Sequence, residues 1–226
     1  MKDPGVHFAT AQEEAYVHLR EGILSGQYPG GTRLNLDAIA RAVRASRMPV
    51  REAIRQLAAE GFLTIRPNRG VVVTQLTADD ILELFETRAV LEGLAARVAA
   101  PGMDAEALGE LQALLVRMER SRGNAAAWLR YHDEFHSAIC RRSGRQRLVE
   151  QATLYRRMVE PYLRVHVGVY DPPEIGGSEH ATLIEALGSR DPARAEAAVR
   201  RHVELGAAYV VDVVKAAGSR RPPDST

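Results

Sequence analysis

The sequence has little of what disulfide-bonded, exported or membrane-embedded proteins need. Its 226 residues include one cysteine, Cys140, which cannot form a disulfide within the chain. No apolar run approaches the roughly 18 residues that span a bilayer, and the N-terminus lacks the basic and apolar segments of a signal peptide. We therefore expect a cytoplasmic protein with no membrane partner, long enough to bury a core without cross-links.

Lysine is also scarce, since only two of the 30 basic residues are lysines, and the net charge is only +1. That charge is unevenly placed: residues 33–70 hold eight arginines and three acidic residues, whereas residues 76–226 hold 20 basic and 22 acidic ones. Arginine can grip a phosphate or a guanine edge with two hydrogen bonds. Because an arginine codon bias would give the same count, the charge alone does not decide for nucleic acid.

Residues 1–75 predict a winged helix-turn-helix domain. Thr10 and Glu13 form a capping box for a helix that ends near Gly26. A helix over 36–43 is followed after a short turn by another, for which Ser46 is a good N-cap. Two β-branched runs then flank residues 67–70, which predicts a small β-hairpin as the wing.

Residues 76–217 predict an all-α antiparallel helical bundle, so the fold class is mainly α. The segments from Thr77 onward are amphipathic and separated by breakers, with no convincing strand. We expect residues 218–226 to form a disordered tail. The expected helices cover residues 78–99, 103–121, 124–143, 145–168, 178–188 and 192–216.

The third predicted helix carries an arginine stripe beside an apolar stripe of Val50, Ile54 and Leu57. In helix-turn-helix proteins the N-terminal residues of the second helix of the motif reach base edges. Arg47 and Arg51 are placed for that contact, whereas Arg55 is expected deeper, toward the core or the DNA backbone.

Polar residues around this helix extend the predicted DNA surface. Ser46 could donate to a phosphate, Arg66 and Arg69 flank the hairpin tip, and Gly70 would let the backbone approach the adjacent groove. A solvated face is the commoner fate of a charge stripe. The combination of helix spacing, arginine spacing and basic hairpin favours double-stranded DNA.

The run LNLDAIARAVRASRMPVREAIRQLAAEGFLTIRPNRGVVV resembles the winged-helix domain of the GntR superfamily. That signature reads S-R-x-P-V-R-E-A-[LI]-x-x-L-x-x-[ED]-G, followed by a wing that ends in R-G-x-x-V. The resemblance covers most of residues 11–75 and implies that Arg47, Arg51 and Gly70 occupy DNA-contact positions. Several members have an arginine where this chain has Asp37, so their operator sequences cannot be carried over.

One position on the apolar stripe of helix 78–99 is occupied by Arg88. A guanidinium that faces a bundle interior is very costly unless it is paired. Arg88 therefore needs a carboxylate, either from the protein as an internal ion pair or from a ligand.

Four histidines lie on the apolar faces of three predicted helices: His132, His136, His180 and His202. His132 and His136 are four residues apart, a spacing that can chelate one metal ion. A single buried histidine is more often a satisfied core residue. Four at interior positions are hard to satisfy unless they converge, so the pattern predicts a metal site.

These positions resemble the FCD domain, the all-helical effector domain of the FadR subfamily of GntR regulators. Its metal-binding members have a [DN]-x-x-x-H pair, then an E-H-x-x-[IL]-x-x-A-[IL] run, and another histidine about 22 residues later. This chain reads H-D-E-F-H at 132–136, EHATLIEAL at 179–187 and RRHVELG at 200–206. The resemblance also implies that Arg88, in a T-R-x-x-L-E-x-x-A-A run, faces the effector pocket.

The chain departs from that pattern at the first ligand, where His132 replaces Asp or Asn. Asp133 is the rival, but it lies on the flank of the apolar stripe, so we prefer His132. Four neutral imidazoles suit zinc, nickel or copper better than calcium or magnesium, with zinc or nickel expected. The full +2 charge, with Arg88 opposite, would attract a small carboxylic acid.

The sequence thus predicts a DNA-binding transcriptional regulator, more often a repressor in this family, which binds operator half-sites as a homodimer. A carboxylate effector at the metal would control its operator affinity. Two alternatives stay open: a metal-dependent enzyme that uses the four-histidine site, and a DNA-binding protein with a purely structural metal. A dedicated DNA-reading domain is hard to explain on an enzyme, so we do not expect enzymatic activity.

Overall fold

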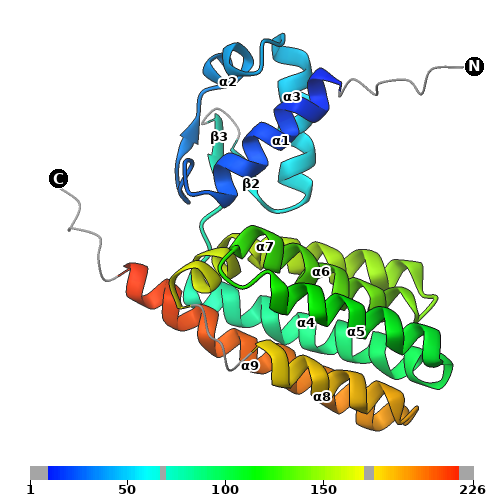
Figure 1. Cartoon of the computed structure of the whole chain (residues 1–226). Coiled ribbons are helices and arrows are strands. Elements are labelled where there is room, and N and C mark those ends of the chain that lie inside the picture. The colour runs from blue at the N-terminus through cyan, green and yellow to red at the C-terminus, as the bar shows by residue number, and fades with distance from the viewer. Residues whose placement is uncertain (1–9, 67–69, 171–175, 219–226) are drawn as a thin grey trace, which may run out of the picture. The chain divides into compact units, whose positions relative to one another are not determined.

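The computed structural model describes residues 10–66, 70–170 and 176–218. The chain divides into two compact units, residues 1–75 and 76–226. The first contains a helix-turn-helix and a small sheet, and the second is a helical bundle (Figure 1). This arrangement confirms the predicted fold class.

The first unit packs three helices against a small sheet. Its helices are α1 (Ala11–Leu24), α2 (Leu36–Ala42) and α3 (Arg47–Ala59), and its strands are β1 (Arg33–Leu34), β2 (Leu63–Arg66) and β3 (Gly70–Val73). The capping box that opens α1 is present: Glu13 N donates to Thr10 Oγ1 at 3.2 Å, and Thr10 N donates to Glu13 Oε2 at 2.6 Å. Apolar residues from all three helices and the sheet share one core.

The sheet has three antiparallel strands in the order β1-β3-β2. The predicted hairpin corresponds to β2 and β3, where Leu63 lies opposite Val73. The sequence analysis missed β1, in which Arg33 lies opposite Val72. Two residues are too few to show the alternation by which a strand is recognised, and only pairing with β3 defines this one.

The second unit contains only helices among its described residues. They are α4 (Ala78–Ala99), a 3-10 turn η1 (Ala100–Gly102), α5 (Ala105–Arg120), α6 (Ala125–Arg141), α7 (Gln146–Tyr170), α8 (Gly176–Gly188) and α9 (Pro192–Gly218). Their bounds differ from the predicted ones by a few residues. Gly218 ends α9, and the rest of the predicted tail lies outside the described residues. No described helix combines the length and apolarity needed to cross a bilayer.

Helix α4 is central to the bundle, because it packs against α6, α7 and α9 (Figure 1). The contact with α9 is very close at Gly93, where an added Cβ would lie 2.4 Å from Cγ of Arg200. A side chain at position 93 would therefore require the Arg200 side chain to move. Close packing of α4, α6 and α9 brings their few polar residues together inside the core.

Candidate functional site

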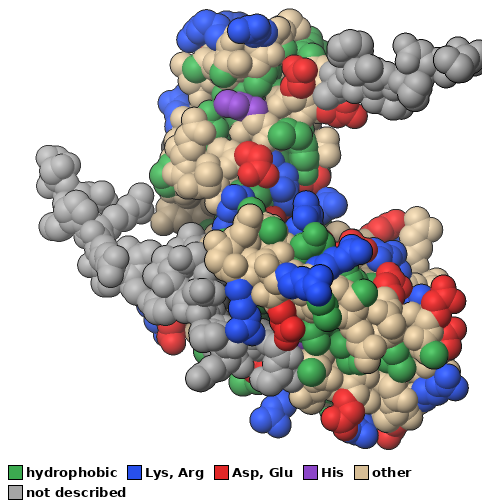
Figure 2. Space-filling model, viewed as in Figure 1, with side chains coloured by type: hydrophobic (Ala, Val, Ile, Leu, Met, Phe, Trp, Pro, Cys, Tyr) green, Lys and Arg blue, Asp and Glu red, His purple; other side chains and the backbone are tan. Residues whose placement is uncertain are grey.

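The exposed face of α3 carries the predicted arginine stripe. Arg47, Arg51 and Arg55 are exposed, and Arg55 donates to Glu52 at 2.7 Å. Arg55 does not lie toward the core, because the helix turns its guanidinium to solvent; its contact with the DNA backbone stays a prediction. Figure 2 shows basic side chains gathered over the end of this unit that holds α2. The opposite face of α3 packs into the core through Val50, Ala53, Ile54 and Leu57.

Arg47 forms an ion pair on this surface, because its guanidinium contacts Asp37 in the first turn of α2. Nη2 of Arg47 donates to Oδ2 of Asp37 at 2.7 Å, and Nε donates to Oδ1. Both side chains are exposed, so the pair adds little stability. Its effect is geometric, since two parallel contacts fix the plane of the guanidinium.

Of the other residues predicted at the DNA surface, the structure describes Ser46, Arg66 and Gly70. Ser46 is at the N-cap position of α3, but its side chain makes no capping hydrogen bond, contrary to the expectation. Gly70 has φ +85°, a conformation that favours glycine. Arg66 is exposed at the end of β2, whereas Arg69 lies outside the described residues.

The second unit brings together the four predicted histidines. His132 and His136 come from α6, His180 from α8 and His202 from α9. One ring nitrogen of each lies within 4.8 Å of those of the other three, and the ring centroids are 4.6–6.5 Å apart. We call these four residues the histidine cluster. Three separate helices therefore direct imidazoles to one point.

Burial keeps His132 and His136 in their neutral, ligand-competent form. Burial lowers the pKa of His132 well below its usual value, and the neighbouring histidines and Arg88 lower it further. Burial also lowers the pKa of His136 to about 4, against the opposing effect of Glu92. Neutral imidazole is the form that binds metal ions.

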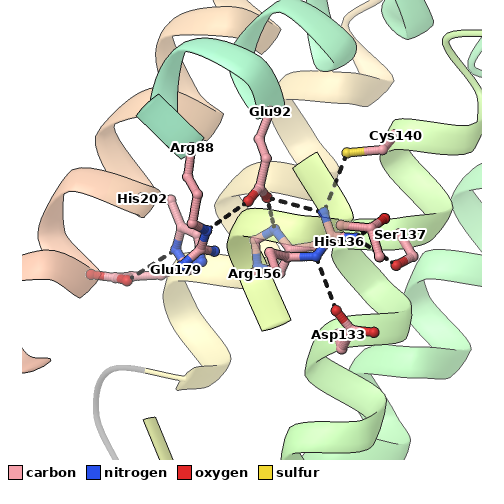
Figure 3. A network of polar contacts seen from close by, with 10 residues as sticks. Arg88, Glu92, Asp133, His136, Ser137, Cys140, Arg156, Glu179 and His202 are labelled. Atoms are coloured by element: carbon pink, nitrogen blue, oxygen red, sulfur yellow. Dashed lines mark hydrogen bonds and ion pairs between the residues drawn. The ribbon is translucent and has the colours of Figure 1, made fainter. Parts of the chain in front are cut away.

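Two carboxylates orient rings of the histidine cluster. Oε2 of Glu92 lies 3.0 Å from Nδ1 of His136, although the angle at that nitrogen falls short of a regular hydrogen bond. Glu179 lies 3.2 Å from Nδ1 of His202 (Figure 3). Carboxylates that hold one ring nitrogen and leave the other for a metal are common outer partners of metal-binding histidines.

The residues fit a late divalent metal ion. Nε2 of His136 is buried and has no hydrogen-bond partner among the described residues. Such an orphaned acceptor is costly in a protein core unless it meets a ligand. An imidazole set with outer carboxylates suits zinc, nickel or copper. The histidine cluster could therefore bind a metal ion.

Asp133, the rival first ligand, is engaged elsewhere. Its side chain is half exposed, and Oδ1 accepts from Nε of Arg156 at 3.0 Å (Figure 3). Arg156 itself is buried and also donates to Ser137 at 2.7 Å. The cluster contains His132 and not Asp133, as the position of each on the apolar stripe predicts.

Arg88 is buried beside the histidine cluster. Its side chain is 3% exposed, Nε donates to Oε1 of Glu92 at 3.0 Å, and the guanidinium carbon lies 4.7 Å from the centroid of the Phe85 ring. The required internal carboxylate therefore exists. Nη1 of Arg88 is nevertheless buried with no hydrogen-bond partner among the described residues. Arg88 and His132 both line a cavity of about 30 Å³.

Sequence reasoning missed Glu92 and Arg156, although each had a signal. Glu92 follows Arg88 by one helical turn on the same face of α4. Arg156 lies four residues after Ala152 and three before Val159, both of which are buried. Nη1 of Arg156 lies 3.8 Å from Oε2 of Glu92. Charged residues at core positions of two helices could have been paired with each other.

Comparison with known families decides the identity of the chain. Residues 11–73 match the family described as bacterial regulatory proteins, gntR family, and residues 83–205 match the FCD domain. The chain belongs to the gntR family. Members are transcriptional regulators rather than enzymes, so the helix-turn-helix of this gntR regulator binds DNA and the enzyme alternative is set aside.

Curated relatives agree with this assignment. The HTH-type transcriptional repressor GlaR of Escherichia coli is 29% identical over 84% of this gntR regulator and 91% of GlaR. A protein of Paenarthrobacter nicotinovorans named "Probable D-xylose utilization operon transcriptional repressor" is 32% identical over 83% of this chain and 82% of its own length.

Solved structures support the fold. McbR/YncC of E. coli aligns with a TM-score of 0.75 at 20% identity over 91% of this chain and 99% of its own. A GntR regulator from Rhodococcus sp. RHA1 aligns with a TM-score of 0.71 at 23% identity over 90% and 99%. At such low identity these similarities establish the architecture alone.

Proposed function

We propose that this gntR regulator is a homodimeric repressor whose affinity for operator DNA is controlled by a small carboxylic acid bound at a metal ion. The metal, zinc or nickel, is held by His132, His136, His180 and His202. Arg88 binds the acid. The operator is contacted by Ser46, Arg47, Arg51, Arg69 and Gly70.

The observation that carries this proposal is the spacing of the histidine cluster. Nitrogens bonded at about 2.0–2.1 Å to one six-coordinate ion lie about 2.9 Å apart when adjacent and about 4.1 Å apart when opposite, and four of them leave two positions open. The ring nitrogens here lie within 4.8 Å, so small side-chain movements suffice to bind an ion. When bound, that ion supplies positive charge and coordination positions for a carboxylate.

The surroundings of the cluster favour an acidic effector. Nη1 of Arg88 is a buried donor that lacks a partner among the described residues. A carboxylate between the metal and this guanidinium would satisfy both. The cavity beside them, about 30 Å³, has room for about two water molecules. A single carboxylate group is of that size, which favours a small acid.

Repression and dimerisation rest on the relatives and on general properties of helix-turn-helix proteins. GlaR and the Paenarthrobacter protein are both named repressors. Helix-turn-helix dimers bind two half-sites about one helical turn apart. An effector changes operator affinity only if it binds one dimer geometry more tightly than the other, and the second unit is where it would discriminate.

Small acids are expected to raise the melting temperature of the metal-loaded protein. A ligand at 100 times its dissociation constant stabilises the folded state by about 2.7 kcal/mol, which corresponds to about 5–10 °C in a chain of this length. The measurement is a thermal melt of nickel-loaded protein with acetate, lactate, malate or citrate. Arg88→Lys keeps the charge but loses the Nη1 donor, so it should remove most of the shift.

Arg97→Lys is the matched control, because Arg97 is an exposed arginine on the same helix. It should keep the full shift. If the wild type binds metal but no acid of the panel alters its melting temperature, the metal is structural and the effector proposal is wrong.

Asp37→Asn is expected to raise the affinity for non-operator DNA. The change weakens the pair with Arg47 and removes a negative charge near the phosphates, an interaction of about 1 kcal/mol, so affinity should rise about fivefold. If Arg47 gains one phosphate, the slope of log affinity against log salt steepens by about 0.9. Asp79→Asn removes an equal charge from the other unit and should change neither quantity. An unaltered affinity in Asp37→Asn would show that Asp37 does not restrain Arg47.

A further inference from the structure

A single buried carboxylate touches both halves of the proposed sensor. Glu92 is 1% exposed on α4, and its two oxygens face different partners. Oε1 accepts from Nε of Arg88 at 3.0 Å, whereas Oε2 lies 3.0 Å from Nδ1 of His136 (Figure 3). Nη1 of Arg156 approaches Oε2 at 3.8 Å. Glu92 therefore contacts one residue proposed to bind the metal, His136, and one proposed to bind the acid, Arg88.

The ion pair with Arg88 places a buried negative charge between the two binding groups. The Glu92 carboxylate, whose negative charge pairs with Arg88 and lies 3.0 Å from Nδ1 of His136, favours the Nδ1–H form of that ring and leaves Nε2 as the acceptor. The same charge fixes Nε of Arg88, which leaves Nη1 as a donor. Both atoms that remain are the buried orphans described above.

From these contacts we propose that Glu92 is a positioning residue that prepares His136 for the metal and Arg88 for the acid at the same time. This inference rests on the proposed function and names a residue that neither binding role includes. A side chain that orients two binding groups links their affinities, because loosening it disorders both.

Glu179 provides a built-in comparison. It lies 3.2 Å from Nδ1 of His202, as Glu92 lies beside His136, but no described contact joins it to Arg88. A residue that only orients a metal ligand should affect metal binding alone. A residue that orients both groups should also affect acid binding after the metal site has been saturated.

The experiment measures two dissociation constants in the full-length protein. The first is for Ni²⁺ alone, and the second is for the most stabilising acid of the panel at saturating Ni²⁺. Glu92→Gln should weaken Ni²⁺ binding by about 10–100-fold and acid binding by at least about tenfold, as loss of a charge-assisted contact implies. Glu179→Gln should weaken Ni²⁺ binding similarly and change acid binding less than about twofold.

Two further variants complete the test. Glu86→Gln, an exposed change on the same helix, should alter neither constant. Glu92→Asp keeps the charge but withdraws the carboxylate by one methylene, so it should weaken both affinities less than Glu92→Gln does. If Glu92→Gln does not fold, Glu92→Asp replaces it in the test. Its affinities for Ni²⁺ and for the acid should still each fall by at least about threefold.

The outcomes separate this inference from the function on which it rests. If folded Glu92 variants lose only Ni²⁺ affinity, as Glu179→Gln does, or lose neither affinity, the linking role is wrong while the sensor proposal stands. If the wild type binds neither Ni²⁺ nor any acid of the panel, the proposed function and the role of Glu92 fail together.

Discussion

Replacing both Arg47 and Arg51 by alanine is expected to abolish specific operator binding. Both guanidinium groups are exposed at the start of α3, where residues of a helix-turn-helix reach base edges. A bidentate arginine–guanine contact contributes about 1–3 kcal/mol. The loss of two in each half of a dimer approaches the whole difference between specific and non-specific affinity, about 4–10 kcal/mol. In vitro selection from random DNA provides the operator, and a binding titration at fixed salt measures the loss.

The matched control is the double change of Arg141 and Arg142 to alanine, two exposed arginines on the second unit. It removes the same charge per chain and should leave operator binding within about threefold of wild type. Metal content should not change in either variant. Specific binding that survives in the Arg47 and Arg51 variant would contradict the assignment of α3 as the reading helix.

Replacing His180 or His202 by alanine is expected to empty the metal site. Each side chain belongs to the histidine cluster and comes from its own helix. The loss of one ligand should lower affinity by more than the roughly 10–100-fold that the loss of an outer partner costs. Elemental analysis of purified protein and a Ni²⁺ titration measure the effect. The response to acids should disappear with the metal.

His18→Ala tests whether this effect is specific to the cluster. His18 lies in the other unit, where Nε2 is 3.2 Å from the hydroxyl of Tyr28. Its loss should leave metal content unchanged. Full metal retention by both His180→Ala and His202→Ala would overturn the ligand assignment.

The histidine cluster was predictable because each of its members replaces an apolar residue on the buried stripe of a helix. Helical periodicity therefore places His132 and His136 inside, and it turns Asp133 to the flank. Arg88 was recognised by the same rule. Periodicity indicates which side of a helix a residue occupies. That information is enough to identify a candidate site residue when a polar side chain falls on the buried side.

Contacts between elements were less predictable. The pair of Arg47 with Asp37 joins α3 to α2, and the approach of Arg156 to Glu92 joins α7 to α4. Each depends on the angle and distance at which helices pack, which periodicity does not give. The sequence analysis treated Asp37 as a departure from the family pattern, whereas the structure makes it the partner of a predicted base-reading residue.

The very close packing at Gly93 connects the sequence of α4 to the conformation of a side chain near the histidine cluster. Helix α9 carries both Arg200, which faces Gly93, and His202 of the histidine cluster. A methyl group at position 93 would lie 2.4 Å from Cγ of Arg200 and 3.1 Å from its Cδ, so the Arg200 side chain, two residues from His202, would have to move.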